Sequence, residues 1–185
     1  LMGALAADAL TEGDENIAIG KHALGGETLG NYSVAVGSAA LKAQNFTTST
    51  SAYNVAVGRG AGEAVTTGVS NTIVGGLAGD GLTDADENVA VGFAALGSDT
   101  LGSKSTAIGR GTLVSQNFTT ATDSYNTAVG YSAGNAVTTG LRNTFLGGLS
   151  GDAFTESSDN VALGYNALST DTLGSNSVAV GAFAL

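Results

Sequence analysis

A repeat anchored on glycine is the feature that most constrains how this chain can fold. A glycine follows a short aliphatic segment, typically x-A-V or x-A-I, at regular intervals of 17 residues, and every fourth interval is 21 residues, so that four repeats make a superperiod of 72. A fixed period of this length is typical of solenoids, in which each repeat packs only against its neighbours. The eleven anchors are Gly3, Gly20, Gly37, Gly58, Gly75, Gly92, Gly109, Gly130, Gly147, Gly164 and Gly181.

The segment before each anchor has the pattern of a short strand. In "VAVG" at 34–37, Val34 and Val36 share one face of an extended chain and Ala35 lies on the other. Since valine and isoleucine are strong strand formers, we expect the columns one and three residues before the anchor to line the core. The alanine column is apolar too, so we expect a second copy of the chain to cover that face.

Asparagine recurs four residues before the anchor, with serine in its place in one of every four repeats. In stacked coils these side chains would form a ladder, because asparagine favours the turn that enters a strand and stacked amides can bond from coil to coil. The predicted ladder comprises Asn16, Asn54, Asn71, Asn88, Asn126, Asn143 and Asn160.

These patterns predict an all-β chain, a parallel β-solenoid or β-roll of about eleven coils that rises roughly 4.8 Å per coil. Glycine together with Val and Thr at every strand position disfavours helices. We expect residues 1–185 to form a single solenoid array, an excerpt of a longer fibre. Each 21-residue repeat adds four residues within 42–54 or 114–126, which predicts a Thr- and Ser-rich loop every four coils.

The predicted loops carry candidate glycosylation sites. Asn45 and Asn117 each begin an N-x-T motif, completed by Thr47 and Thr119, at equivalent positions of the superperiod. A third motif starts at Asn31. In the alternative interpretation the motifs are accidental and the hydroxyl groups bond to water.

Acidic turns are the candidate metal sites. Asp80, Asp84, Asp86 and Glu87 cluster in a glycine-rich segment, and carboxylate oxygens there suit Ca²⁺. The match to the nonapeptide calcium-roll pattern is partial, so a solvated acidic surface is the alternative that we favour. His22, the single histidine, is replaced by Ala94 one superperiod later, and no other cofactor is expected.

Composition excludes several classes of function. A net charge of −10 with six basic residues argues against binding to nucleic acid or to anionic membranes, and no apolar run reaches the length of a spanning helix. Gly58, Gly60 and Gly62 are spaced G-x-G-x-G, unlike the G-x-G-x-x-G of dinucleotide sites, and the repeated copy loses the middle glycine. No base, nucleophile and orienting group converge in the sequence, so we expect no enzyme activity.

The repeats themselves point to a family. "NSVAVGAFAL" (176–185), "YSVAVGSAAL" (32–41) and "KSTAIGRGTL" (104–113) resemble the head repeats of trimeric autotransporter adhesins and the related repeats of phage tail fibres and surface fibres. The likeness covers nearly the whole chain. It implies a left-handed parallel β-roll in each chain, association of three chains around an axis, and a role in extracellular adhesion.

We therefore expect a non-catalytic extracellular fibre segment, an adhesin head or surface filament that presents repeated loops. The alternative is a phage tail-fibre module that recognises a host-surface glycan. The expected partners are further copies of the chain, as a homo-oligomer, a trimer or a filament, and a surface glycan or matrix ligand. The expected location is extracellular, at a cell or virion surface, without membrane insertion of this segment.

Overall fold

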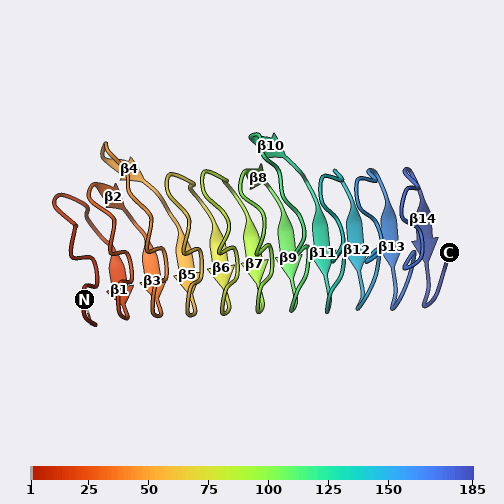
Figure 1. Cartoon of the computed structure of the whole chain (residues 1–185), viewed down its shortest axis with the longest axis horizontal. Coiled ribbons are helices and arrows are strands. Elements are labelled where there is room, and N and C mark those ends of the chain that lie inside the picture. The colour runs from red at the N-terminus through yellow and green to blue at the C-terminus, as the bar shows by residue number, and fades with distance from the viewer. Residues whose placement is uncertain (1) are drawn as a thin grey trace.

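The computed structural model describes residues 2–185 as a straight rod of stacked coils, with the two ends of the chain at opposite ends of the rod (Figure 1). One parallel sheet of ten three-residue strands runs along its whole length. These strands are β1 (Ile17–Ile19), β3 (Val34–Val36), β5 (Val55–Val57), β6 (Thr72–Val74), β7 (Val89–Val91), β9 (Thr106–Ile108), β11 (Thr127–Val129), β12 (Thr144–Leu146), β13 (Val161–Leu163) and β14 (Val178–Val180).

The predicted β-solenoid is confirmed. Each strand pairs in parallel with the strand of the next coil, so that equivalent repeat positions lie side by side, as in Ala35 opposite Ala56. The described residues contain no helix. The rod has about ten turns rather than the expected eleven, because the first anchor follows only an isolated bridge between Met2 and Ile19.

The prediction of which strand face forms the core is wrong. The middle residue of each strand points inward and is buried, whereas the flanking valine, isoleucine, leucine and threonine side chains are half-buried or exposed. The chain's own coil therefore covers the alanine column, and no second copy is needed there. The inward column consists of Ala18, Ala35, Ala56, Ile73, Ala90, Ala107, Ala128, Phe145, Ala162 and Ala179.

Most side chains of the inward column are small because they share the coil interior with a second column of residues. The fourth residue after the anchor faces the inward column and is also buried in every coil but the last, and it is leucine in most coils whose strand centre is alanine. Where the strand centre is Ile73 or Phe145, glycine takes that position. A Cβ on Gly79 would lie 3.3 Å from Ile73 Cδ1, and one on Gly151 would lie 2.6 Å from Phe145 Cδ1. Because protein interiors are close-packed, a large side chain at the strand centre requires a small residue four positions after the anchor.

The anchor glycine permits the close stacking of coils at the end of each strand. Gly75 has φ 138°, and a Cβ on it would lie 2.5 Å from the carbonyl oxygen of the next anchor, Gly92. Real Cβ atoms do not approach backbone so closely, so a side chain there would push the coils apart. The repeat therefore requires glycine at this position.

Two protruding loops interrupt the regular coils, as the 21-residue repeats predict (Figure 1). β2 (Gly30–Asn31) pairs in parallel with β4 (Thr50–Ser51) at the base of the first loop, and β8 (Gly102–Ser103) pairs with β10 (Thr122–Asp123) at the base of the second. Each small sheet places its loop at the same side of the rod, one superperiod from the other.

Candidate functional site

The asparagine side chains form a buried ladder, as the sequence predicts. Each Oδ1 accepts a hydrogen bond from the main-chain N–H at the equivalent position of the next coil, as in Asn71 N to Asn54 Oδ1 at 2.9 Å and Asn88 N to Asn71 Oδ1 at 3.0 Å. Except at Asn160, the Nδ2 group donates to a carbonyl fourteen residues further on, as from Asn71 to Ala85 at 2.8 Å. Since Asn54, Asn71 and Asn88 have no exposed surface, these bonds satisfy polar groups inside the rod.

A buried carboxylate that the sequence analysis missed holds the base of each loop. Glu27 is fully buried, and its Oε1 accepts main-chain hydrogen bonds from the 28–30 turn and from Phe46 across the loop. Its Oε2 accepts a bond of 2.8 Å from Gln44 Nε2. Five N–H donors thus surround one carboxylate, and they fix the loop to the preceding coil.

The second loop repeats this arrangement with a shorter acid. Asp99 accepts bonds from Gly102 N, Phe118 N and Gln116 Nε2, and it is also fully buried. The signal in the sequence is the recurrence of an acid and a glutamine at the superperiod, Glu27 with Gln44 and Asp99 with Gln116. This recurrence alone does not predict burial, because acidic residues are usually exposed to solvent.

The glycosylation candidates lie where an attached sugar would have room. Asn45, Asn117, Thr47 and Thr119 are all exposed on the loops, beyond the fixed base. The Oδ1 atoms of Asn45 and Asn117 accept hydrogen bonds of 2.9 and 3.0 Å from Thr28 and Thr100 of the preceding coil. Their glycosylation remains a prediction.

The acidic turns do not come together as a metal site. Asp84 accepts a bond from the Thr67 hydroxyl, and Asp86 accepts one of 2.7 Å from Val69 N, so both are engaged by the neighbouring coil. Partial burial raises the pKa of the Asp80 carboxyl, and the negative charge of Glu63 on the neighbouring coil raises it further. Among residues 2–185, no three His, Cys, Asp or Glu side chains converge in a way that could hold a metal ion.

Gly58, Gly60 and Gly62 are turn residues of one coil, all with positive φ, and no cavity or cleft of ligand size opens on the surface formed by residues 2–185. The candidate sites that the described residues offer lie on the outer faces of the rod. One is apolar, and another combines aromatic and basic side chains.

The apolar surface is the outer face of the ten-stranded sheet, which we call the outer sheet face. Its residues stand one and three positions before each anchor, and none of them is charged. Their side chains are half-buried or exposed, reaching 50% exposure at Ile17 near one end of the rod and 72% at Val178 near the other. The face comprises Ile17, Ile19, Val34, Val36, Val55, Val57, Thr72, Val74, Val89, Val91, Thr106, Ile108, Thr127, Val129, Thr144, Leu146, Val161, Leu163, Val178 and Val180.

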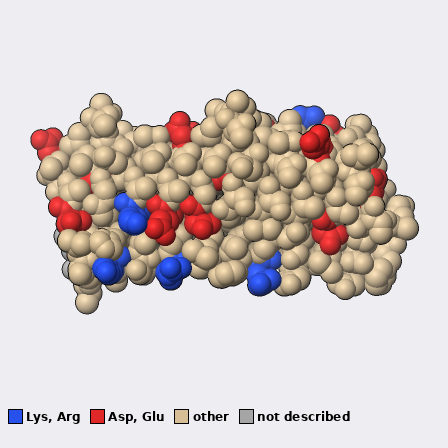
Figure 2. Space-filling view, viewed as in Figure 1, with Lys and Arg blue, Asp and Glu red and all other residues tan. Residues whose placement is uncertain are grey.

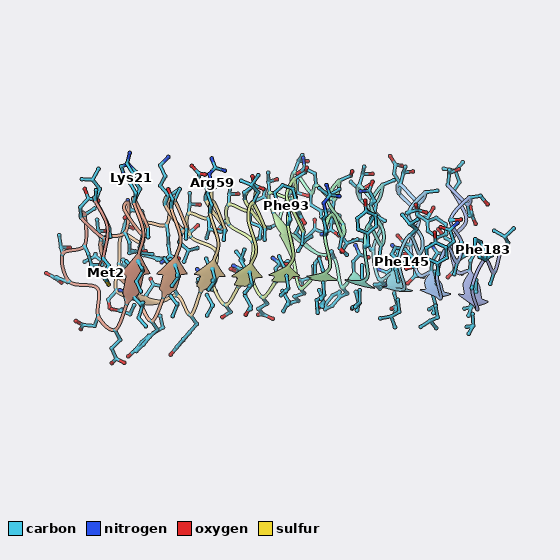
Figure 3. The ribbon with its side chains drawn as sticks, turned by 90° about the horizontal axis from the view of Figure 1, so that it is seen from below. Met2, Lys21, Arg59, Phe93, Phe145 and Phe183 are labelled. Atoms are coloured by element: carbon cyan, nitrogen blue, oxygen red, sulfur yellow. The ribbon has the colours of Figure 1, made fainter. Side chains whose placement is uncertain are left out.

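The second surface is the row of residues that directly follow the anchors, which we call the post-anchor row. Figure 3 shows the labelled Lys21, Arg59 and Phe93 on the same side of the ribbon. Phe93, Tyr131 and Tyr165 are 50–55% exposed, and Arg110 lies between the first two. The row runs Lys21, Ser38, Arg59, Gly76, Phe93, Arg110, Tyr131, Gly148, Tyr165 and Ala182.

Comparison with known proteins adds no family to this description. No family model, no curated protein and no solved structure matches the chain. The structure therefore defines the class of protein, a β-solenoid repeat protein. Between residues 2 and 185, none of the segments forms a helix of the length and hydrophobicity that a membrane crossing requires.

Proposed function

We propose that the chain is a non-catalytic structural segment of an extracellular fibre, in which rods associate through the outer sheet face and present the two loops. The observation that carries the proposal is the uncharged and largely apolar outer sheet face along all ten strands. Monomeric proteins rarely leave a continuous apolar patch of more than a few hundred Å² in water. A sheet that is apolar on both faces is typically covered on both.

The size of this face suits association of identical chains. Ten strands at the usual spacing give a strip about 48 Å long, and three residues make it about 10 Å wide. Two such strips would together bury roughly 1,000 Å², near the lower limit for a specific interface, and a third chain would add to this. The repeat also places uncharged valine, isoleucine, leucine or threonine side chains at equivalent positions along the strip, so the same kind of contact could recur from coil to coil.

The resemblance to autotransporter adhesin heads and phage fibres supports the same proposal, because those repeats belong to extracellular fibres that associate through their coils. It leads us to expect a cell or virion surface location and a trimer or filament. The loops, fixed at their base by Glu27 and Asp99, would then project at regular intervals for glycosylation or contact with a partner.

Sedimentation analysis of the protein and of a Val89→Lys, Val91→Lys variant tests the proposal. Both residues lie on the outer sheet face in the middle of the rod. We expect the unaltered protein to form an oligomer and the variant to dissociate, because lysine cannot be buried without a partner. A Thr66→Lys, Thr67→Lys control on an exposed turn should leave the oligomer unchanged. A monomeric unaltered protein, or an oligomer insensitive to the lysines, would contradict the proposal.

A further inference from the structure

The basic residues of this acidic chain fall into two groups. Lys42, Lys104 and Arg142 form ion pairs with Glu63, Asp123 and Asp159. The other three, Lys21, Arg59 and Arg110, all stand in the post-anchor row and are exposed, and none forms an ion pair with any residue of 2–185. With a net charge of −10, the chain has carboxylates to spare. Figure 2 shows some basic groups along the lower margin of the rod and others beside acidic groups elsewhere on this face.

Arg110 is held in a position that suits a planar anionic group. Its guanidinium carbon lies 5.7 Å from the centre of the Phe93 ring and 5.7 Å from that of the Tyr131 ring, so aromatic rings flank it on both sides. Nη1 donates a bond of 3.3 Å to the Tyr131 hydroxyl. This packing restrains the side chain, and guanidinium edges bind carboxylate and similar oxyanions with two parallel hydrogen bonds.

The aromatic side chains of the row have a regular spacing. Phe93, Tyr131 and Tyr165 follow anchors that are two coils apart, and one coil rises by the strand spacing of about 4.8 Å, so neighbouring rings are roughly 10 Å apart along the axis. Gly76 and Gly148 stand beside Phe93 and Tyr165, where a Cβ would be 3.6 Å from each ring. The row therefore presents partly exposed aromatic side chains at a regular interval.

This geometry fits a linear polysaccharide. A distance of two coils is close to the length of a disaccharide unit in an extended β-1,4-linked chain, so alternate pyranose rings could each contact the exposed part of one aromatic side chain. Exposed tyrosine and phenylalanine provide apolar surface with little loss of side-chain freedom, which favours such contacts. Acidic groups on the sugar would then meet the unpaired cations of the same row.

We infer that the post-anchor row, centred on Phe93, Arg110, Tyr131 and Tyr165, binds an extended polysaccharide whose sugar rings carry acidic groups. The anchor glycines separate this row from the outer sheet face, so the inference does not depend on self-association of the rod. An acidic protein would otherwise repel such a polymer, which gives the local row of cations its selective role.

Isothermal titration of the assembled protein with three hexasaccharides tests the inference: a β-1,4-linked oligouronate, a sulfated oligosaccharide and neutral cellohexaose. We expect the oligouronate or the sulfated sugar to bind, cellohexaose to bind at least about tenfold more weakly, and added salt to weaken the acidic sugars. Stronger uronate binding assigns carboxylate as the group recognised, and stronger binding of the other sugar assigns sulfate. Equal binding of all three sugars, or binding of none, would overturn the inference.

Two matched variants locate the site. Tyr131→Ala should lower the affinity by about tenfold, a typical loss for one well-placed aromatic contact. Tyr125→Ala is the control. Tyr125 is 53% exposed and the centre of its ring lies 5.5 Å from Lys104 Nζ, but it stands outside the post-anchor row. Sedimentation and thermal unfolding should be unchanged in both. Equal effects of the two variants, or loss of binding only together with loss of assembly, would overturn the assignment of the site to the row.

Discussion

The anchor glycine is the residue with the least tolerance for change. Substitution Gly75→Ala would force a Cβ to within 2.5 Å of the Gly92 carbonyl oxygen and place alanine at φ 138°. We expect it to lower the free energy of unfolding by at least about 2 kcal/mol, through strained backbone and displaced coils. Chemical denaturation measures this loss.

The neighbouring glycine provides the control for that measurement. A Cβ on Gly76 would meet only the Phe93 ring, at an ordinary contact distance of 3.6 Å, and its φ is not positive. Gly76→Ala should therefore change the stability little. Equal losses in the two variants would mean that general flexibility, and not coil stacking, accounts for the repeated glycine.

Asp152 is the residue for which we predict a clear pH dependence. Its Oδ1 is buried without a hydrogen-bond partner among the described residues, and desolvation by burial raises the pKa of the carboxyl above its ordinary value of 3.8. Because the folded-state pKa is the higher one, its stabilising contribution is complete below pH 3.8 and is lost as the pH rises through the raised pKa. Asp152→Asn should therefore raise the unfolding midpoint at pH 7 and leave it unchanged at pH 3.

For Asp159 we expect the opposite dependence of stability on pH. A hydrogen-bonded ion pair with Arg142 lowers the pKa of the Asp159 carboxyl, so any stabilising contribution is present at neutral pH and is lost in acid. The pair is exposed, and such pairs contribute little. Asp159→Asn should have no effect or a slightly destabilising one at pH 7. A gain in stability from this variant as large as that from Asp152→Asn would show that removal of negative charge in general is responsible.

At the scale of the strand and its facing turn, the two buried columns should compensate for each other. Phe145→Ala would leave a cavity and lower the free energy of unfolding by about 3–5 kcal/mol. Adding Gly151→Leu should recover much of that loss, because it recreates the alanine–leucine pair of other coils, such as Ala90 with Leu96. Denaturation of the single and double variants tests this coupling.

Gly151→Leu alone is the informative control for the pair. A Cβ at Gly151 would lie 2.8 Å from Phe145 Cζ, so this single variant should be overpacked and destabilised. If the two single changes simply add in the double variant, the columns do not share one volume and our description of the core is incorrect.

Much of the fold can be predicted from the sequence, but the orientation of the strands cannot. The period, the anchors, the strand positions and the asparagine ladder are all predictable, because each depends on local spacing that stacking repeats coil after coil. The inward face was assigned wrongly, because β-propensity marks Val34 and Val36 as strand residues but does not tell which face has room. The narrow coil interior decides this, and the glycine opposite Ile73 and Phe145 was the available clue.

Some features of the candidate sites were likewise predictable from the sequence, and others were not. Exposure of Asn45 and Asn117 was predictable from the extra length of their repeats. The buried role of Glu27 was not, because it depends on five donors that only the folded loop brings together. The sandwich of Arg110 between Phe93 and Tyr131 likewise requires the stacking of coils to become visible.

At the scale of the whole molecule, the array should tolerate changes of length by complete superperiods. Deletion of residues 92–163 joins Val91 to Gly164, the anchor equivalent to Gly92, and should leave a shorter solenoid of the same register. We expect retained β-structure in circular dichroism and lower stability, because fewer coil interfaces remain. Deletion of 92–161 leaves two surplus residues at the junction and should disrupt the adjoining coils. Equal behaviour of the two deletions would contradict stacking in register.

The central claim concerns what covers the outer sheet face, and cryo-electron microscopy of the native assembly tests it most directly. We predict that the face from Ile17 to Val180 packs against the same face of other copies, with the loops outside the contact and sugar density on Asn45, Asn117, Thr47 or Thr119 if they are glycosylated. Rods that leave this face in solvent, or that associate only through other surfaces, would contradict the account.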